Sequence, residues 1–184
     1  MGADGARAEK LLEVDLATGA ERDRPDAGRD GDTGAGEPER SHDGTTLAGN
    51  WSGCLQRYDI VGDSFGPCQK PRVGDWPPSV DATGEHIALG TDVYDGSLQF
   101  LRRVHTTISE NSIAPTALSV DGEYLYLALS KWVLRSRVSD GALLDRFAIP
   151  SEPTSIRASP DGRMLVIVEN HFSTTSTINT VDLR

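Results

Sequence analysis

The sequence lacks long apolar runs. Hydrophobic residues make up 37% of its 184 residues, which is low for a globular domain. No run approaches the roughly 18 apolar residues of a membrane-spanning helix. No apolar signal-peptide segment follows the first residues, MGADGARAEK. We therefore expect a soluble protein without a membrane span, and export remains open if the N-terminus is truncated.

Basic residues are scarce relative to acidic ones. The chain has 18 Lys and Arg against 28 Asp and Glu, for a net charge of −10. No block of Lys or Arg interrupts this acidic background. Nucleic acid and anionic membranes are therefore not expected partners.

Cysteine is nearly absent. The two cysteines, Cys54 and Cys68, form neither a CxxC motif nor a cluster with histidine, so we predict no zinc site. They lie 14 residues apart, and a disulfide is feasible if the strands that carry them pair. The bridge would form in an oxidising compartment, whereas the cytosol would keep two thiols.

Catalytic signatures are missing as well. The sequence contains no Gly-x-Ser-x-Gly motif, no glycine-rich phosphate loop and no paired carboxylates. We therefore predict no catalytic residue, no cofactor and no metal ligand.

A turn followed by a short apolar run is present, and it organises the chain. In Ser159-Pro160-Asp161-Gly162, proline presets φ, aspartate bonds its own backbone, and glycine accepts a conformation that other residues avoid. Met164 to Val168 follows, rich in β-branched residues and typical of a strand buried on both faces.

The same unit recurs along the chain. The turn aspartates Asp43, Asp81, Asp121 and Asp161 are spaced by 38, 40 and 40 residues. Each turn precedes an expected strand: Thr46 to Gly49, His86 to Gly90, Tyr124 to Leu129, and Met164 to Val168. Further strands are expected at Ser97 to Val104 and at Ala142 to Ile149.

Four short strands in about 40 residues are the signature of a β-propeller blade, and each blade needs a neighbour to cover its faces. We predict an all-β chain of four-stranded antiparallel blades, the repeats spanning 41–78, 79–118, 119–158 and, in part, 159–184. Residues 1–24 read as partial blade strands. Residues 25–40 read as a disordered, acidic, glycine-rich loop because they hold no apolar residue larger than alanine.

These turns and strands resemble the group of YVTN-type, lactonase-like and WD40-like propeller repeats. The sequence departs from true WD40 repeats, since no Gly-His pair opens a blade and no Trp-Asp pair closes a third strand.

Propellers close with four to eight blades, and two arrangements follow. The chain is a piece of a larger propeller with an incomplete ring, which we favour. Alternatively, Leu11 to Leu16 supplies the outer strand of the last blade and closes a small ring.

For function we favour a non-catalytic binding or scaffold module that contacts an unknown protein or small ligand. Its candidate interaction surface comprises Trp76, Lys131, Arg135 and Arg137. The alternative is a lactonase-like propeller hydrolase with a site at the central channel, drawing on His86, Asp81 or Glu123.

Overall fold

The computed structural model describes residues 12–24, 37–51, 53–71, 77–104, 114–150, 152–170 and 176–183. Every regular element in these ranges is a β-strand. No described segment forms a helix with the length and hydropathy needed to cross a bilayer.

The strands form one hairpin and four antiparallel sheets, in which hydrogen-bonded neighbours follow one another along the chain. The hairpin pairs β1 (Leu12–Val14) with β2 (Glu21–Asp23). Blade 1 contains β3 (Glu39–Arg40), β4 (Thr46–Trp51), β5 (Cys54–Asp59) and β6 (Ser64–Phe65). Blade 2 contains β7 (Ser79–Val80), β8 (His86–Leu89), β9 (Asp92–Asp95) and β10 (Phe100–Arg103).

The second half of the chain repeats the pattern. Blade 3 contains β11 (Thr116–Leu118), β12 (Tyr124–Leu129), β13 (Trp132–Arg137) and β14 (Leu143–Ala148). Blade 4 has three strands, β15 (Pro153–Ala158), β16 (Met164–Asn170) and β17 (Ser176–Asp182). The prediction of an all-β chain built from antiparallel blades is confirmed.

The predicted turns form through the chemistry of their side chains. In blade 4 the Ser159 hydroxyl donates to Asp161 Oδ1 at 2.6 Å, and the Gly162 amide donates to the Ser159 carbonyl at 2.8 Å. Gly162 has a φ of 67°, a conformation that favours glycine. The same serine–aspartate bond closes the turn of blade 1, from Ser41 to Asp43.

Three hydrophobic clusters lie between consecutive blades. Blades 1 and 2 share a cluster of Ala48, Leu55, Ile87, Leu89, Tyr94 and Leu98. Blades 2 and 3 share Ala88, Val93, Val104, Leu118, Leu125 and Val138. Blades 3 and 4 share Ala117, Tyr126, Ala128, Val133, Ile149, Ile156, Leu165 and Ile167. Each blade thus covers an apolar face of its neighbour, as stacked repeats require.

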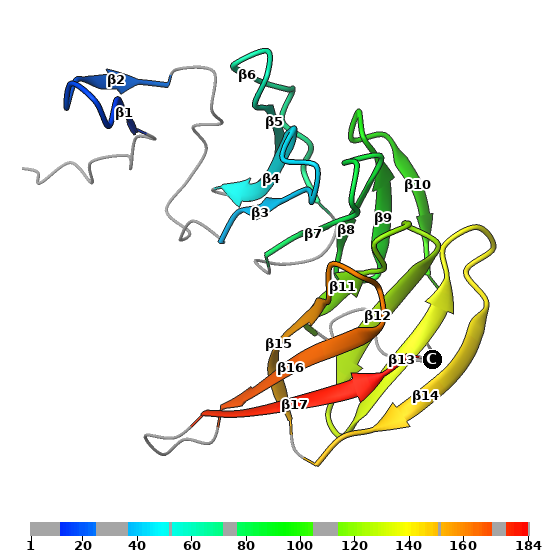
Figure 1. Cartoon of the computed structure of the whole chain (residues 1–184). Helices are drawn as coiled ribbons and strands as arrows, with labels where there is room; N and C mark the ends of the chain where they lie inside the picture. The colour runs from blue at the N-terminus through cyan, green and yellow to red at the C-terminus, as the bar shows by residue number, and fades with distance from the viewer. Residues whose placement is uncertain are drawn as a thin grey trace, which may run out of the picture.

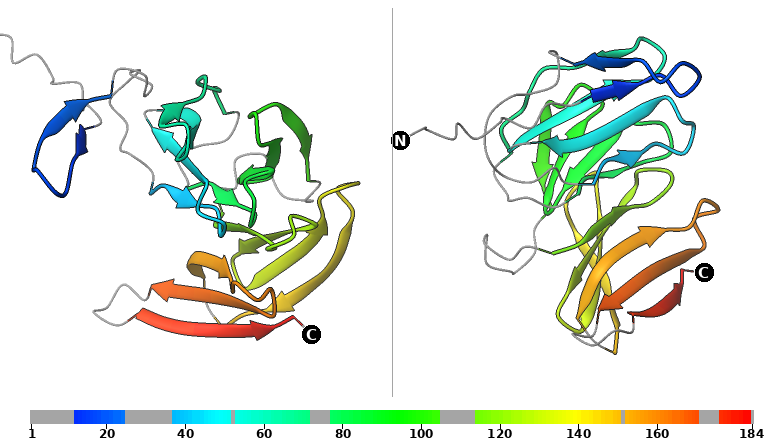
Figure 2. Two further views of the ribbon diagram at one scale, coloured as in Figure 1. Left: turned by 45° about the horizontal axis from the view of Figure 1, so that its top comes forward. Right: turned by 90° about the vertical axis from the view of Figure 1, so that its left-hand side faces the viewer.

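The blades follow one another around a common axis (Figures 1 and 2). The first strand of each blade, β3, β7, β11 or β15, is the inner one. Backbone bonds between turns tie the blades together at one end of these strands: the Asp43 amide donates to the Ala82 carbonyl, and the Ala82 amide donates to the Val120 carbonyl, both at 2.9 Å.

Two expectations are corrected. The loop predicted through Arg40 ends earlier, because Glu39 and Arg40 pair with Ala48 and Leu47 of β4. This strand is polar and buries little apolar surface. Its backbone pairing with β4 and an ion pair of Glu39 hold it in place instead. Residues 25–36 lie outside the described residues.

The alternative in which the N-terminal strand closes a small ring is also wrong for the residues that the structure describes. β1 pairs with β2, and blade 4 has the order β15-β16-β17 without an N-terminal strand. The polar hairpin turn at residues 15–20, in which the Ala17 amide donates to Asp15 Oδ1 at 2.8 Å, holds β1 beside β2.

Candidate functional site

The inner strands bring distant parts of the chain together at the axis. Glu39 on β3 of blade 1 pairs with Arg157 on β15 of blade 4, with 2.9 Å between Oε2 and Nη2. This ion pair joins the first and the last blade. The side chains of Glu39 and Arg157 are 22% and 35% exposed, so both are only partly hydrated.

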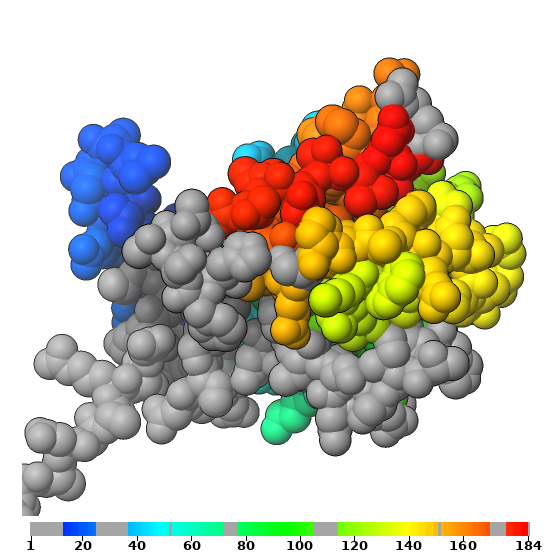
Figure 3. Space-filling view, turned by 90° about the horizontal axis from the view of Figure 1, so that it is seen from below, coloured from blue at the N-terminus to red at the C-terminus, as the bar shows by residue number. Residues whose placement is uncertain are grey.

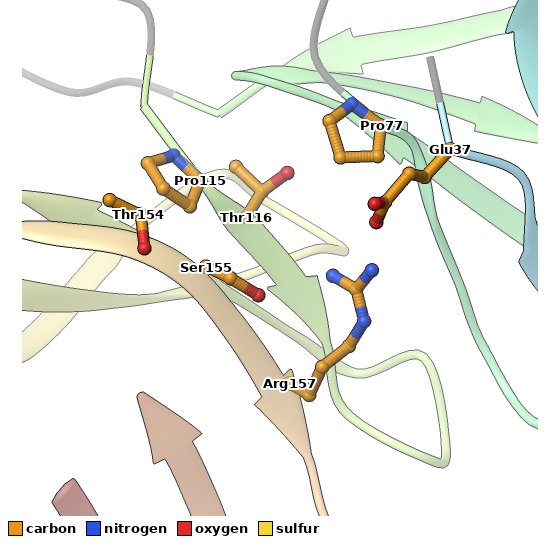
Figure 4. Close-up of a pocket in the computed structure, with 7 residues that line it drawn as sticks. All are labelled: Glu37, Pro77, Pro115, Thr116, Thr154, Ser155 and Arg157. Atoms are coloured by element: carbon orange, nitrogen blue, oxygen red, sulfur yellow. The ribbon is translucent and has the colours of Figure 1, made fainter. Parts of the chain in front are cut away.

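A cavity of about 300 Å³ lies beside this ion pair, which we call the axial cavity. Its walls come from the residues that open the inner strands of the four blades: Glu37, Pro77, Pro115, Thr116, Thr154, Ser155 and Arg157. Figure 4 shows the Glu37 carboxylate and the Arg157 guanidinium turned toward each other across it.

The charges at the cavity and beside it are incompletely balanced. Burial raises the pKa of Glu39, the Arg157 guanidinium opposes that rise, and the nearby Glu37 carboxylate adds to it. Two carboxylates therefore face one guanidinium. Arg157 also donates from Nη1 to the Ile156 carbonyl at 3.1 Å.

Two threonines in equivalent positions differ in their hydrogen bonding. Thr154 is the second residue of β15 and donates from Oγ1 to the Val168 carbonyl at 3.1 Å. Thr116 opens β11 and is 3% exposed, and its Oγ1 has no partner among the described residues. A buried hydroxyl without a partner carries a desolvation cost that a ligand in the cavity would relieve.

A second cavity of about 190 Å³ lies at the other end of the inner strands and shares Arg157 with the first. The turns of the blades line it, and His42 and Asp81 are among its residues. His42 is exposed, while Asp81 is 3% exposed.

The structure brings two of the three residues of the hydrolase alternative together. His86 Nδ1 lies 2.9 Å from Asp81 Oδ2. The same carboxylate accepts the amides of Glu85 and His86, both at 3.0 Å, so it already holds the turn of blade 2. Glu123 is exposed in the turn of blade 3. Among the described residues no group of three or more His, Cys, Asp or Glu is arranged to hold a metal.

The predicted interaction surface is divided. Arg135 pairs with Asp145, with 3.1 Å between Nε and Oδ1, and lies over the ring of Tyr124. Arg137 pairs with Asp140 at 2.7 Å, and Lys131 is exposed. Trp76 lies outside the described residues. The two arginines thus have intramolecular partners, and an interaction role for this surface stays a prediction.

Cys54 and Cys68 are joined in the structure, with their Cα atoms 5.4 Å apart, within the range that disulfides adopt. Backbone bonds between Leu55 and Gln69 run beside them. The redox state in the native compartment stays a prediction.

Sequence reasoning missed the axial residues Glu37, Glu39, Thr116 and Arg157. One signal pointed to the place. Pro115-Thr116 and Pro153-Thr154 repeat at the start of successive inner strands, and this position meets the axis in each blade. The pairing of Glu39 with Arg157 had no local signal, because these residues lie at opposite ends of the array.

Comparisons with known proteins agree with this architecture. No protein-family model matches the chain, and no curated protein matches it. Among solved structures, TolB from Acinetobacter baumannii is similar over 95% of this chain and 46% of its own, with 14% identity and a TM-score of 0.62. Hydrazine synthase from Kuenenia stuttgartiensis is similar over 79% of this chain and 45% of its own, with 16% identity and a TM-score of 0.59. The chain thus spans less than half the length of either neighbour, and both likenesses show the fold alone, a β-propeller arrangement of blades.

Proposed function

We propose that this chain is a non-catalytic binding module whose ligand, or a group of a partner protein, enters the axial cavity. One observation carries the proposal. The cavity is walled by the inner-strand openings of all four blades and contains Thr116, a buried hydroxyl without a partner among the described residues. Ligand sites are typically concave and carry a few convergent polar groups.

The resemblance to YVTN-type, lactonase-like and WD40-like repeats supports the same proposal at the level of the repeat. In the described residues, the serine–aspartate turns and the apolar clusters between blades serve the stacking. The axial side chains do not belong to those clusters, so they do not serve the apolar packing between blades.

The proposal is tested by filling the cavity. Ser155→Trp places a large side chain at its wall, and Ser139→Trp serves as a matched control outside it. We expect a ligand screen by NMR to find binders of the unmodified chain that S155W loses and S139W retains. Binders that S155W retains would contradict a site in this cavity.

A hydrolase remains the second proposal because His86 and Asp81 form a His–carboxylate contact, and His86 is 31% exposed. Such a contact orients an imidazole for proton transfer. The test is turnover of ester and lactone substrates by the intact chain and by His86→Gln. Turnover that H86Q abolishes would favour the hydrolase over the binding module.

A further inference from the structure

We propose that the axial cavity recognises a cationic group rich in hydrogen-bond donors, a guanidinium or a primary ammonium. This inference rests on the proposed binding function and names the chemistry of the ligand.

The charge at the cavity points in this direction. Two charged side chains line it, Glu37 and Arg157. Glu39, which lines the second cavity, pairs with Arg157 from beside the axial cavity, so the three charges together sum to −1. Arg157 already forms an ion pair with Glu39 and donates a hydrogen bond to the Ile156 carbonyl. An incoming anion would have to compete with Glu39 for it, whereas a cation would meet the carboxylates that remain under-neutralised.

Burial strengthens this preference. Glu39 is partly buried, and both its burial and the Glu37 carboxylate oppose its ionised form. Charge pairs interact more strongly where water is partly excluded. A cation beside Glu37 and Glu39 would offset their mutual repulsion, so we expect binding to depend on both side chains.

Apart from the Arg157 guanidinium and the Ser155 hydroxyl, the side chains that line the cavity offer a ligand acceptors rather than donors. Pro77 and Pro115 line it without an amide hydrogen to donate. The Thr154 hydroxyl already donates its hydrogen to the Val168 carbonyl. The unpartnered Thr116 Oγ1 has lone pairs that can accept from a ligand. A guanidinium or ammonium supplies only donors and thus matches these acceptors.

The size of the cavity limits the ligand. About 300 Å³ lies at the lower end of the range for small-molecule sites, and it suits one basic side chain or a small amine. The group has two sources, a free molecule or the basic side chain of a partner protein. The net charge of −10 attracts either one.

The experiment titrates the intact chain, by NMR and calorimetry at low salt, with agmatine and with a short alanine-rich peptide that carries one arginine. A peptide with citrulline in place of arginine is the neutral analogue. We expect agmatine or the arginine peptide to bind and the citrulline peptide to bind at least tenfold more weakly. Tighter binding of agmatine would identify a free molecule as the source, and tighter binding of the peptide would identify a partner side chain.

Variants locate the site. Glu37→Gln and Glu39→Gln should each weaken binding about tenfold, while Glu85→Gln, an exposed carboxylate outside both cavities, should not change it. Thr116→Val should weaken binding several-fold without lowering the melting temperature. E37Q changes an exposed residue, so it keeps the test valid if E39Q does not fold.

The outcomes separate the two proposals. Equal affinity for the citrulline and arginine peptides, or unchanged affinity in E37Q, would overturn the cationic ligand. If neutral or anionic binders are then lost in S155W, the binding function stands. If S155W retains every binder, the axial cavity fails as a binding site altogether.

Discussion

The two end blades present their outward faces differently. On blade 1 the guanidinium of Arg24 covers the rings of Tyr58 and Phe65, at 5.2 and 5.3 Å from their centroids. On blade 4, Met164 and Ile178 remain 41% and 67% exposed, and β17 lies open on the surface (Figure 3). One outward face therefore has a polar cap, and the other keeps apolar side chains in contact with solvent.

The cap on blade 1 is electrostatic in nature. The Arg24 side chain is 6% exposed and bonds to Glu13 of β1 at 2.8 Å and to Asp63 of blade 1. The exposed Arg22 side chain also bonds to Asp63, at 2.9 Å. Two guanidiniums, one buried and one exposed, thus hold the hairpin on the blade. The Arg24 side chain lies over apolar rings and its carboxylate partners face outward, so this face of blade 1 has a polar cover.

The opposite faces of blade 4 differ because side chains alternate along a strand. Leu165 and Ile167 point toward blade 3 and belong to the shared cluster. Val166 and Val168 point the other way, beside Thr180 and Ile178 of β17. The same strand therefore has a packed face and an outward face, and substitutions on the two should differ.

The largest expected effect separates these two faces. Leu165→Ala removes a side chain with 0% exposure, and we expect unfolding free energy to fall by about 2–5 kcal/mol. Ile178→Ala on the outward face should change it by less than about 0.5 kcal/mol, as for ordinary surface substitutions. Urea unfolding followed by circular dichroism measures both. Equal losses would mean that the outward face of blade 4 is packed in solution.

The disulfide gives the next effect, and it belongs to blade 1. Its outer strand β6 has two residues, so cross-linking Cys54 to Cys68 across 14 residues supports a weakly paired edge. The chain-entropy model gives about 3 kcal/mol for a loop of this size. We expect the double variant Cys54→Ser, Cys68→Ser to lose about that much. Reductant should lower the melting temperature of the unmodified chain and leave that of the variant unchanged. If reductant does not change the melting temperature of the unmodified chain, no disulfide had formed.

The contrast between the blades also shows what the sequence could predict. The turns were predictable because neighbouring residues fix their conformation: Ser159 bonds to Asp161, and Gly162 accepts a positive φ. Strand β3 was missed because Glu39 is held by blade 4, and no nearby residue signals that contact. Sequence reasoning also had no means to tell the unpartnered Thr116 from the bonded Thr154, since both follow a proline.

Removal of the polar cap should have a smaller effect. Arg24→Ala removes one of the two guanidiniums that Glu13 and Asp63 share, and Arg22 remains as the other. These carboxylates are also 43% and 51% exposed, so solvent screens much of the loss. We expect about 1–2 kcal/mol in unfolding free energy, because the packing over Tyr58 and Phe65 is lost as well.

A conservative variant tests the geometry of the cap. Arg24→Lys keeps the charge but not the planar fork, so it should fall between R24A and the unmodified chain. Limited proteolysis within 12–24 is the second measurement, and we expect R24A to be cut faster there. Equal cleavage in R24A and the unmodified chain would show that Arg24 does not hold the hairpin.

The smallest effect is a pH dependence of the same cap. Hydrogen bonds from Arg22 and Arg24 lower the pKa of Glu13, and hydrogen bonds from Tyr58, Arg24 and Arg22 lower the pKa of Asp63. A carboxyl with a lowered pKa stabilises the folded state above its unfolded pKa, about 4 for these groups, and this contribution is lost as pH falls through the folded value. We therefore expect the hairpin to loosen only below about pH 4, seen as shifts in the NMR signals of residues 12–24. Asp63→Asn should move the onset and weaken docking at neutral pH, whereas Ile178→Ala at the other end should not. A transition centred near pH 6 would point to a histidine and would contradict the role of these carboxylates.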